Sequence, residues 1–259
     1  MVDYAAAATD FRAGRVLARS FSTLFRNIVP FGLLALVLTS PTYVYMILTG
    51  SGDPLGQGTA SPAGTIVISI VEFLLGYLVT AALVYGTIQD LRNEKASVGD
   101  CFSKGLALMF PVVGVAIVSG LITGLATLAL IIPGIIAAVM LWVAIPVAVI
   151  ERRGLNSLLR SAELTKGYRW RIFFLILLLF VVLIGIGMVM GAVTGVIALT
   201  GVSSSGEFSS PALTGLLAMQ WIFSAFMSAL SAVLVAVSYH DLRVAKEGAD
   251  TDQIAAVFD

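Results

Sequence analysis

Few side chains in this 259-residue sequence have the types and spacing that catalysis or metal binding requires. The single cysteine, Cys101, and the single histidine, His240, cannot supply a disulfide or an ordinary metal cluster. His240 lies where the last long apolar segment ends, a position typical of a residue at a membrane surface. No Ser/His/Asp set and no glycine-rich phosphate loop accompanies it. We therefore expect no catalytic residues, no metal and no cofactor, and a protein that is not an enzyme.

One acidic residue, Glu72, differs from the others because it lies well inside a long apolar segment. A carboxylate in a bilayer is costly and faces a protein interior or a wet cavity. Glu72 and Gln220 each lie about 12 Å from the outer end of their own helices, at about 1.5 Å per residue, so the two side chains could meet. They form a candidate intramembrane polar site. The pair is either a hydrogen bond that joins two helices or a site for a proton, a cation or a lipid headgroup.

Positive charge is densest between residues 152 and 171, directly after an apolar segment. This stretch flanks an amphipathic segment that has Leu155, Leu158, Leu159 and Ala162 on one helical face. A cation near an anionic leaflet gains about 1 kcal/mol. We therefore predict that the six cations of this stretch contact lipid phosphate: Arg152, Arg153, Arg160, Lys166, Arg169 and Arg171.

The composition places these residues in a membrane protein. Apolar residues make up 59% of the chain and charged residues 12%, with a mean hydropathy of +1.01, whereas soluble domains are about 45–50% apolar and about 25% charged. About 20 apolar residues in a helix cross a bilayer. Six segments meet this requirement and predict an all-α bundle of six transmembrane helices: Ile28–Leu48, Gly64–Gln89, Leu106–Leu130, Gly134–Ile150, Ile172–Thr200 and Ala212–His240.

The distribution of charge predicts the orientation. All 15 lysines and arginines fall before the first span, after the last one, or in the connections on the same side. The opposite connections, residues 50–63 and 201–211, contain none. By the positive-inside rule, both termini are cytoplasmic, in a bacterial inner membrane. The first 27 residues lack the pattern of a cleavable signal peptide, and we expect the first span to stay in the membrane.

The spans group into three similar units, approximately residues 1–92, 93–153 and 154–259. In each unit an amphipathic segment precedes a span that leaves the cytoplasm, and a second span returns. The returning spans end in an acid with an arginine two residues later, at Asp90, Glu151 and Asp241. The amphipathic segments either lie as anchors at the membrane surface or form a basic cytoplasmic collar that binds a partner or an anionic lipid.

The stretch from Ile131 to Ile172 and the C-terminal residues resemble the six-helix membrane domain attached to some bacterial glycerophosphodiester phosphodiesterases. They also resemble related stand-alone, uncharacterised integral membrane proteins. The resemblance implies the fold but no activity, because catalysis in the fused proteins belongs to a separate barrel domain that no soluble stretch of this sequence could hold. The matching residues are Ile132, Pro133, Gly134, Pro146, Glu151, Arg160, Ser161, Glu163, Leu164, Gly167, Trp170, Arg171, Tyr239, His240, Asp241, Leu242, Arg243, Glu247, Gly248 and Asp250.

Two functions remain in competition. The first is a non-enzymatic integral membrane protein that binds membrane lipids, or a membrane or cytoplasmic protein partner, through the basic collar. The second is a small-solute or ion transporter that uses Glu72. We expect no nucleic-acid partner, and the sequence does not indicate an oligomeric state.

Overall fold

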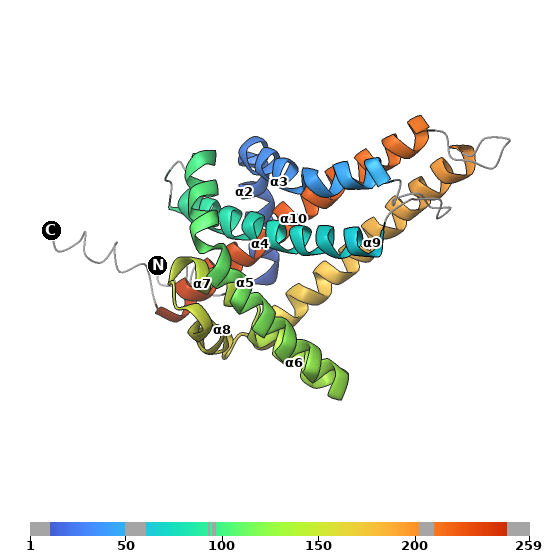
Figure 1. Cartoon of the computed structure of the whole chain (residues 1–259). Helices are drawn as coiled ribbons and strands as arrows, with labels where there is room; N and C mark the ends of the chain where they lie inside the picture. The colour runs from blue at the N-terminus through green and yellow to red at the C-terminus, as the bar shows by residue number, and fades with distance from the viewer. Residues whose placement is uncertain (1–10, 50–60, 93, 95–96, 202–209, 248–259) are drawn as a thin grey trace.

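The computed structural model describes residues 11–49, 61–92, 94, 97–201 and 210–247, and every regular element within these ranges is a helix (Figure 1). The predicted all-α fold is therefore confirmed. The elements are α2 (Ala13–Arg26), α3 (Ile28–Thr49), α4 (Pro62–Leu91), α5 (Val98–Ala129), α6 (Ile131–Met140), α7 (Ala144–Ile150), a 3₁₀ turn η1 (Gly154–Asn156), α8 (Ser157–Thr165), α9 (Arg169–Gly201) and α10 (Ser210–Glu247).

Six helical segments of the described chain are long and apolar enough to cross a membrane, so the chain is a multi-pass membrane protein. They correspond to the six predicted spans. In α2, which precedes the first of them, the buried residues Val16, Ser20, Thr23 and Leu24 share one face. The second amphipathic segment does not form a helix of its own, because it continues without a break into α5.

Polar caps set where two of the spans begin. Ser61 accepts a hydrogen bond from the backbone N–H of Gly64 at 3.0 Å, and Pro62 occupies the first position of α4. Ser97 caps α5 in the same way, through the N–H of Asp100 at 3.0 Å. The Ser97 hydroxyl also donates to the Asp100 carboxylate, so the two side chains are joined at this helix start.

The fourth span is broken into α6 and α7 by a turn at residues 141–143. Pro146 has no N–H to donate to the carbonyl of residue 142, which favours the break at this point. A freed carbonyl inside a membrane must find another donor. The Ser161 hydroxyl on α8 donates to the Met140 carbonyl at 2.8 Å, so the surface helix completes the broken span.

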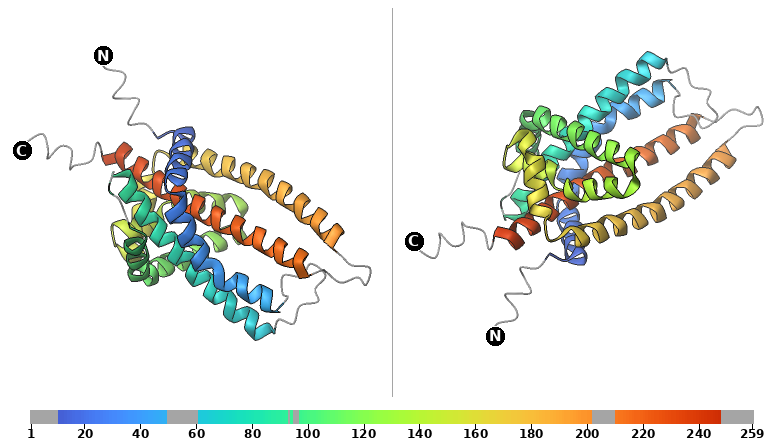
Figure 2. Two further views of the ribbon diagram at one scale, coloured as in Figure 1. Left: turned by 90° about the horizontal axis from the view of Figure 1, so that it is seen from above. Right: turned by 90° about the horizontal axis from the view of Figure 1, so that it is seen from below.

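The packed core is concentrated toward one end of the bundle, which we call the basic end because α2, α8 and the charged ends of α4 and α10 lie there. The buried residues of α4 run only from Leu78 to Ile88, and those of α9 are only Ile172 and Leu175. Toward the other end the helices separate. In Figure 1 the α5–α6 hairpin points away from the far ends of α9 and α10, and Figure 2 shows the same bundle from two further sides. Helices in lipid gain little from hiding apolar surface, which permits this opening.

The α5–α6 hairpin turns within one residue, Leu130, whose backbone is extended. The predicted spans leave residues 131–133 as the connection between them, but these residues belong to the first turn of α6. The role of Gly134 is close packing. A Cβ on this residue would lie 2.0 Å from Thr127 Oγ1 and 2.8 Å from Thr127 Cα, so α5 and α6 approach too closely for any side chain.

We predict that Gly134→Ala destabilises the hairpin, because the added methyl group forces the two backbones apart. Overpacking of this kind costs about 1–3 kcal/mol. The measurement is the thermal midpoint of the detergent-solubilised protein, followed by far-UV circular dichroism. Gly124→Ala on α5 is the matched control, since its Cβ would meet nothing within 4 Å. Equal midpoints for the two variants would contradict the close approach.

Candidate functional site

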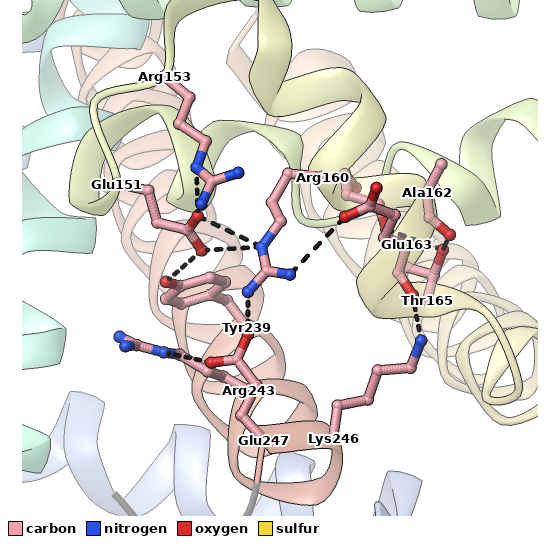
Figure 3. A network of polar contacts seen from close by, with 11 residues as sticks. Glu151, Arg153, Arg160, Ala162, Glu163, Thr165, Tyr239, Arg243, Lys246 and Glu247 are labelled. Carbon is pink, nitrogen blue, oxygen red and sulfur yellow. Dashed lines mark hydrogen bonds and ion pairs between the residues drawn. The ribbon is translucent and has the colours of Figure 1, made fainter. Parts of the chain in front are cut away.

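The end of α7 carries a carboxylate that three other groups contact. Glu151 forms ion pairs with Arg153 at 2.9 Å and with Arg160 of α8 at 3.3 Å (Figure 3). The hydroxyl of Tyr239 on α10 donates to the same carboxylate at 3.1 Å. Glu151 therefore joins the end of α7 to the neighbouring helix α8 and to α10, which is distant in sequence.

Arg160 extends this network to the last turns of α10. Its guanidinium bonds Glu247 and lies 3.7 Å from Glu163. Glu247 also accepts from Arg243 at 3.0 Å, and Lys246 donates to the backbone carbonyl of Glu163. Figure 3 shows these side chains converging between α8 and α10. Every one of the charged residues in this network except Arg153 and Lys246 is also a residue that carries the family resemblance.

The network lies at the edge of the core and is only partly open to solvent. The side chain of Arg160 is 20% exposed and that of Glu151 is 13% exposed. Burial alone lowers the pKa of Arg160, but the hydrogen bond with Glu247 and the charge of Glu151 outweigh it, so the pKa rises above its usual value. Arg160 is therefore a permanent cation whose charge is already neutralised by protein carboxylates.

The acids at the ends of the other two returning spans are paired in the same way. Asp90, at the end of α4, accepts from Arg26 at 2.5 Å. Asp241, near the end of α10, accepts from Arg19 at 2.9 Å. We call Asp90–Arg26, Glu151–Arg160 and Asp241–Arg19 the three exit pairs. In each, an acid where a span leaves the membrane holds an arginine from a surface helix, α2 or α8.

The structure divides the six predicted lipid-phosphate contacts into different environments. Arg153 and Arg160 belong to the network around Glu151. Arg171 donates to the backbone carbonyl of Phe11 at 2.9 Å and lies over the ring of Tyr168. Arg169 is half-buried, while Arg152 and Lys166 are exposed. The six cations therefore do not share one environment, and their contact with lipid phosphate stays a prediction.

Several exposed cations have no ion pair with any residue that the structure describes. They surround the basic end at five separate places along the chain: Arg12, Arg92, Lys104, Arg152 and Lys166. The acids of the exit pairs are largely buried beneath them, with side-chain exposures of 17% for Asp90, 13% for Glu151 and 6% for Asp241. The acids of the exit pairs are thus used inside the fold, and the exposed charged groups at this end include these five cations together with Glu94, Asp100 and Glu163.

Glu72 and Gln220 line the same small pocket, of about 120 Å³, between α3, α4 and α10. Thr39 and Ser224 add hydroxyl groups to its wall. Thr39 accepts from the indole N–H of Trp221 at 2.9 Å. Both Glu72 and Gln220 are exposed at the surface of the bundle. The predicted juxtaposition thus forms a shallow polar pocket, and no hydrogen bond joins the two side chains in the described part of the chain.

The remaining residues with reactive side chains occupy structural positions. Nδ1 of His240 lies 3.4 Å from Asp241, beside an exit pair. Cys101 is buried, with its sulfur 2.9 Å from the position that a Cβ on Gly86 would take. Within the ranges that the structure covers, no group of three or more His, Cys, Asp or Glu residues could hold a metal ion.

Comparison of the chain with protein-family models, curated proteins and solved structures gave no match. The resemblance to the phosphodiesterase-linked membrane domain therefore stays a prediction. The repeated acid-x-arginine pattern points to Asp90, Glu151 and Asp241, but the arginines that pair with them lie on other segments. No local signal in the sequence indicates Arg19, Arg26, Tyr239 or Glu247 as their neighbours.

We predict that Glu151→Gln and Arg160→Gln each lower the free energy of unfolding by about 1–3 kcal/mol, since each removes a charge from the network and leaves its partners with fewer counterions. The double variant should cost less than the sum of the two, because either single change already removes the Glu151–Arg160 ion pair. The thermal midpoints of the two single variants and the double variant, measured in one detergent, give the coupling energy between the two side chains. Arg152→Gln is the matched control, since Arg152 has no ion pair among the described residues. Additive losses would show that the two side chains do not act together.

Proposed function

We propose that this is a non-enzymatic integral protein of a bacterial inner membrane, with both termini cytoplasmic, that binds anionic lipids through its basic end. The observation that carries the proposal is the set of exposed cations around that end, for which the described residues offer no counterion. Surface cations of this kind attract anionic headgroups over a distance set by ionic screening.

The pairing of the acids supports a lipid ligand. If Asp90, Glu151 and Asp241 were exposed, they would repel phosphate and cancel the neighbouring cations. Their burial against Arg26, Arg160 and Arg19 leaves a surface on which the unpaired charge is mostly positive. The arginines of the exit pairs build the fold, and the exposed cations are the ones that remain free to bind a headgroup.

The openness of the bundle supports the same ligand. Many apolar side chains of α9 beyond Leu175 are exposed in the described chain, among them Phe180, Val181 and Met188. In a bilayer, this surface is covered by acyl chains. The spans of this protein separate with distance from the basic end. A neighbouring lipid would therefore meet positive charge at the level of its headgroup and apolar side chains at the level of its acyl chains.

We predict that replacing Arg92, Arg152 and Lys166 with Gln weakens retention of phosphatidylglycerol. At about 1 kcal/mol per cation, the loss in affinity is roughly tenfold or more. Native mass spectrometry, with phosphatidylglycerol and phosphatidylcholine at equal mole fractions, measures the preference directly. The spans should stay inserted, because the other cations of the basic end remain.

The control for this triple variant replaces exposed neutral residues of the same end, as Ser22→Gln, Ser103→Gln and Asn156→Gln. It should retain the wild-type preference for the anionic lipid. If the wild type itself does not discriminate between the two lipids, the proposed function is wrong. If the two triple variants show the same preference for phosphatidylglycerol, the exposed cations serve only to set the orientation of the spans in the membrane.

A second candidate function is transport of a proton or a small cation, favoured by the polar pocket that contains Glu72. In this case proteoliposomes of the wild type should show a cation or proton flux, and Glu72→Gln should abolish it without changing the thermal midpoint. Glu72→Asp, which keeps the carboxylate, should retain part of the flux. An absence of flux in the wild type would exclude this candidate.

A further inference from the structure

A second kind of site lies where α6 faces the first turns of α9. The two helices enclose a groove of about 540 Å³, which is within the range of about 300–1,000 Å³ typical of ligand pockets. Its wall consists of Ile132, Ile135, Ile136 and Val139 from α6 and of Trp170 and Phe173 from α9. One charged residue, Arg169, completes the lining.

Arg169 marks the basic end of this groove. It begins α9, a few residues after Thr165, whose hydroxyl lies 3.4 Å from the carbonyl that ends α6. The α6 side chains extend about 10 Å from Val139 to Ile132, at about 1.5 Å per residue. The groove therefore has a cation at the level of the surface helices and an apolar wall that continues toward the α5–α6 turn.

The charge of Arg169 is not used by the fold. Its Nε is buried and has no hydrogen-bond partner in the described part of the chain. The neighbouring cations are engaged elsewhere or point away: Arg171 bonds the Phe11 carbonyl, and Lys166 is exposed. The half-buried Arg169 thus keeps a guanidinium without a carboxylate partner among the described residues, and a phosphate oxygen is the acceptor that guanidinium geometry fits best.

We infer that this groove holds one anionic phospholipid, with its phosphate on Arg169 and an acyl chain along the isoleucines of α6. The inference rests on the proposed function, because it specifies a single bound lipid within the general attraction of the basic end. An amphiphile is the occupant because the groove is charged at one end and apolar along its length. A free phosphate would leave the apolar wall uncovered.

Another groove of the same protein provides an internal comparison. It lies between α3 and α10, has a volume of about 340 Å³, and is lined by apolar residues and Gly32, with no cation in its lining. Acyl chains enter both grooves in a bilayer. Only the groove with Arg169 distinguishes an anionic lipid from a zwitterionic one, since there the choline cation of phosphatidylcholine would lie near a second positive charge, whereas phosphatidylglycerol carries no such cation.

Trp170 lines the groove and reports on its occupant. The protein has three tryptophans, so the double substitution Trp142→Phe and Trp221→Phe leaves Trp170 alone. This variant is placed in phosphatidylcholine bilayers that contain a small fraction of lipid with brominated chains, either phosphatidylglycerol or phosphatidylcholine. Bromine quenches tryptophan on contact. We expect the brominated phosphatidylglycerol to quench Trp170 several-fold more than brominated phosphatidylcholine at equal mole fraction.

Two pairs of variants in this background assign the excess quenching to the groove. Arg169→Gln should abolish the excess, whereas the matched change Arg243→Gln, which removes a cation paired with Glu247 outside the groove, should leave it. Ile135→Phe, which fills the groove, should reduce it, whereas Gly32→Phe in the other groove should not. Equal quenching by the two brominated lipids, or an excess that survives Arg169→Gln, would overturn the inference. The proposed function stands independently if native mass spectrometry still shows a preference for phosphatidylglycerol.

Discussion

A carboxylate at the end of a membrane-crossing helix must be either hydrated or paired with a cation, and this protein pairs all three of its own. Asp90, Glu151 and Asp241 each accept an arginine from a helix at the surface of the bundle. Hydrogen bonds between charged groups contribute about 1.5–3 kcal/mol each. Because the three acids end different spans, the exit pairs join α2 and α8 to α4, α7 and α10. The position of the surface helices, and thus of the exposed cations, depends on them.

The exit pairs also explain where the helices of the bundle pack closely. The core is densest beside them, around Val84, Val147 and Val237, and the helices separate with distance from the basic end. Lipid tails solvate apolar side chains as well as another helix does, so no strong force closes the far half. The grooves beside α6 and α3 are consequences of this arrangement. We propose that lipids contribute to the structure of such a fold, and that a lipid whose phosphate meets Arg169 is the most specific example.

Much of this architecture could be predicted from the sequence, because a bilayer imposes simple requirements on length and charge. The six spans follow from hydropathy, and the juxtaposition of Glu72 and Gln220 follows from depth along two helices. The pairing of Arg19 with Asp241 could not be predicted, since 222 positions separate them and only the crossing of α2 over α10 brings them together. The six cations between Arg152 and Arg171 look alike in sequence. Only packing distinguishes Arg160, which is neutralised by three carboxylates, from Arg169, which lines a groove without a counterion.

We expect the exit pairs to hold the helices of the basic end in one arrangement, while lipid chains occupy the space between the helices of the far half. Pulsed electron–electron double resonance in lipid nanodiscs tests it with two pairs of spin labels in a Cys101→Ala background. One pair, Phe21→Cys with Leu159→Cys, reports on α2 and α8; the other, Ile66→Cys with Val189→Cys, reports on the far parts of α4 and α9. All four positions are exposed. The account predicts a narrow distance distribution for the first pair and a broad one for the second. Equally narrow distributions would show a bundle packed along its whole length and would contradict the account.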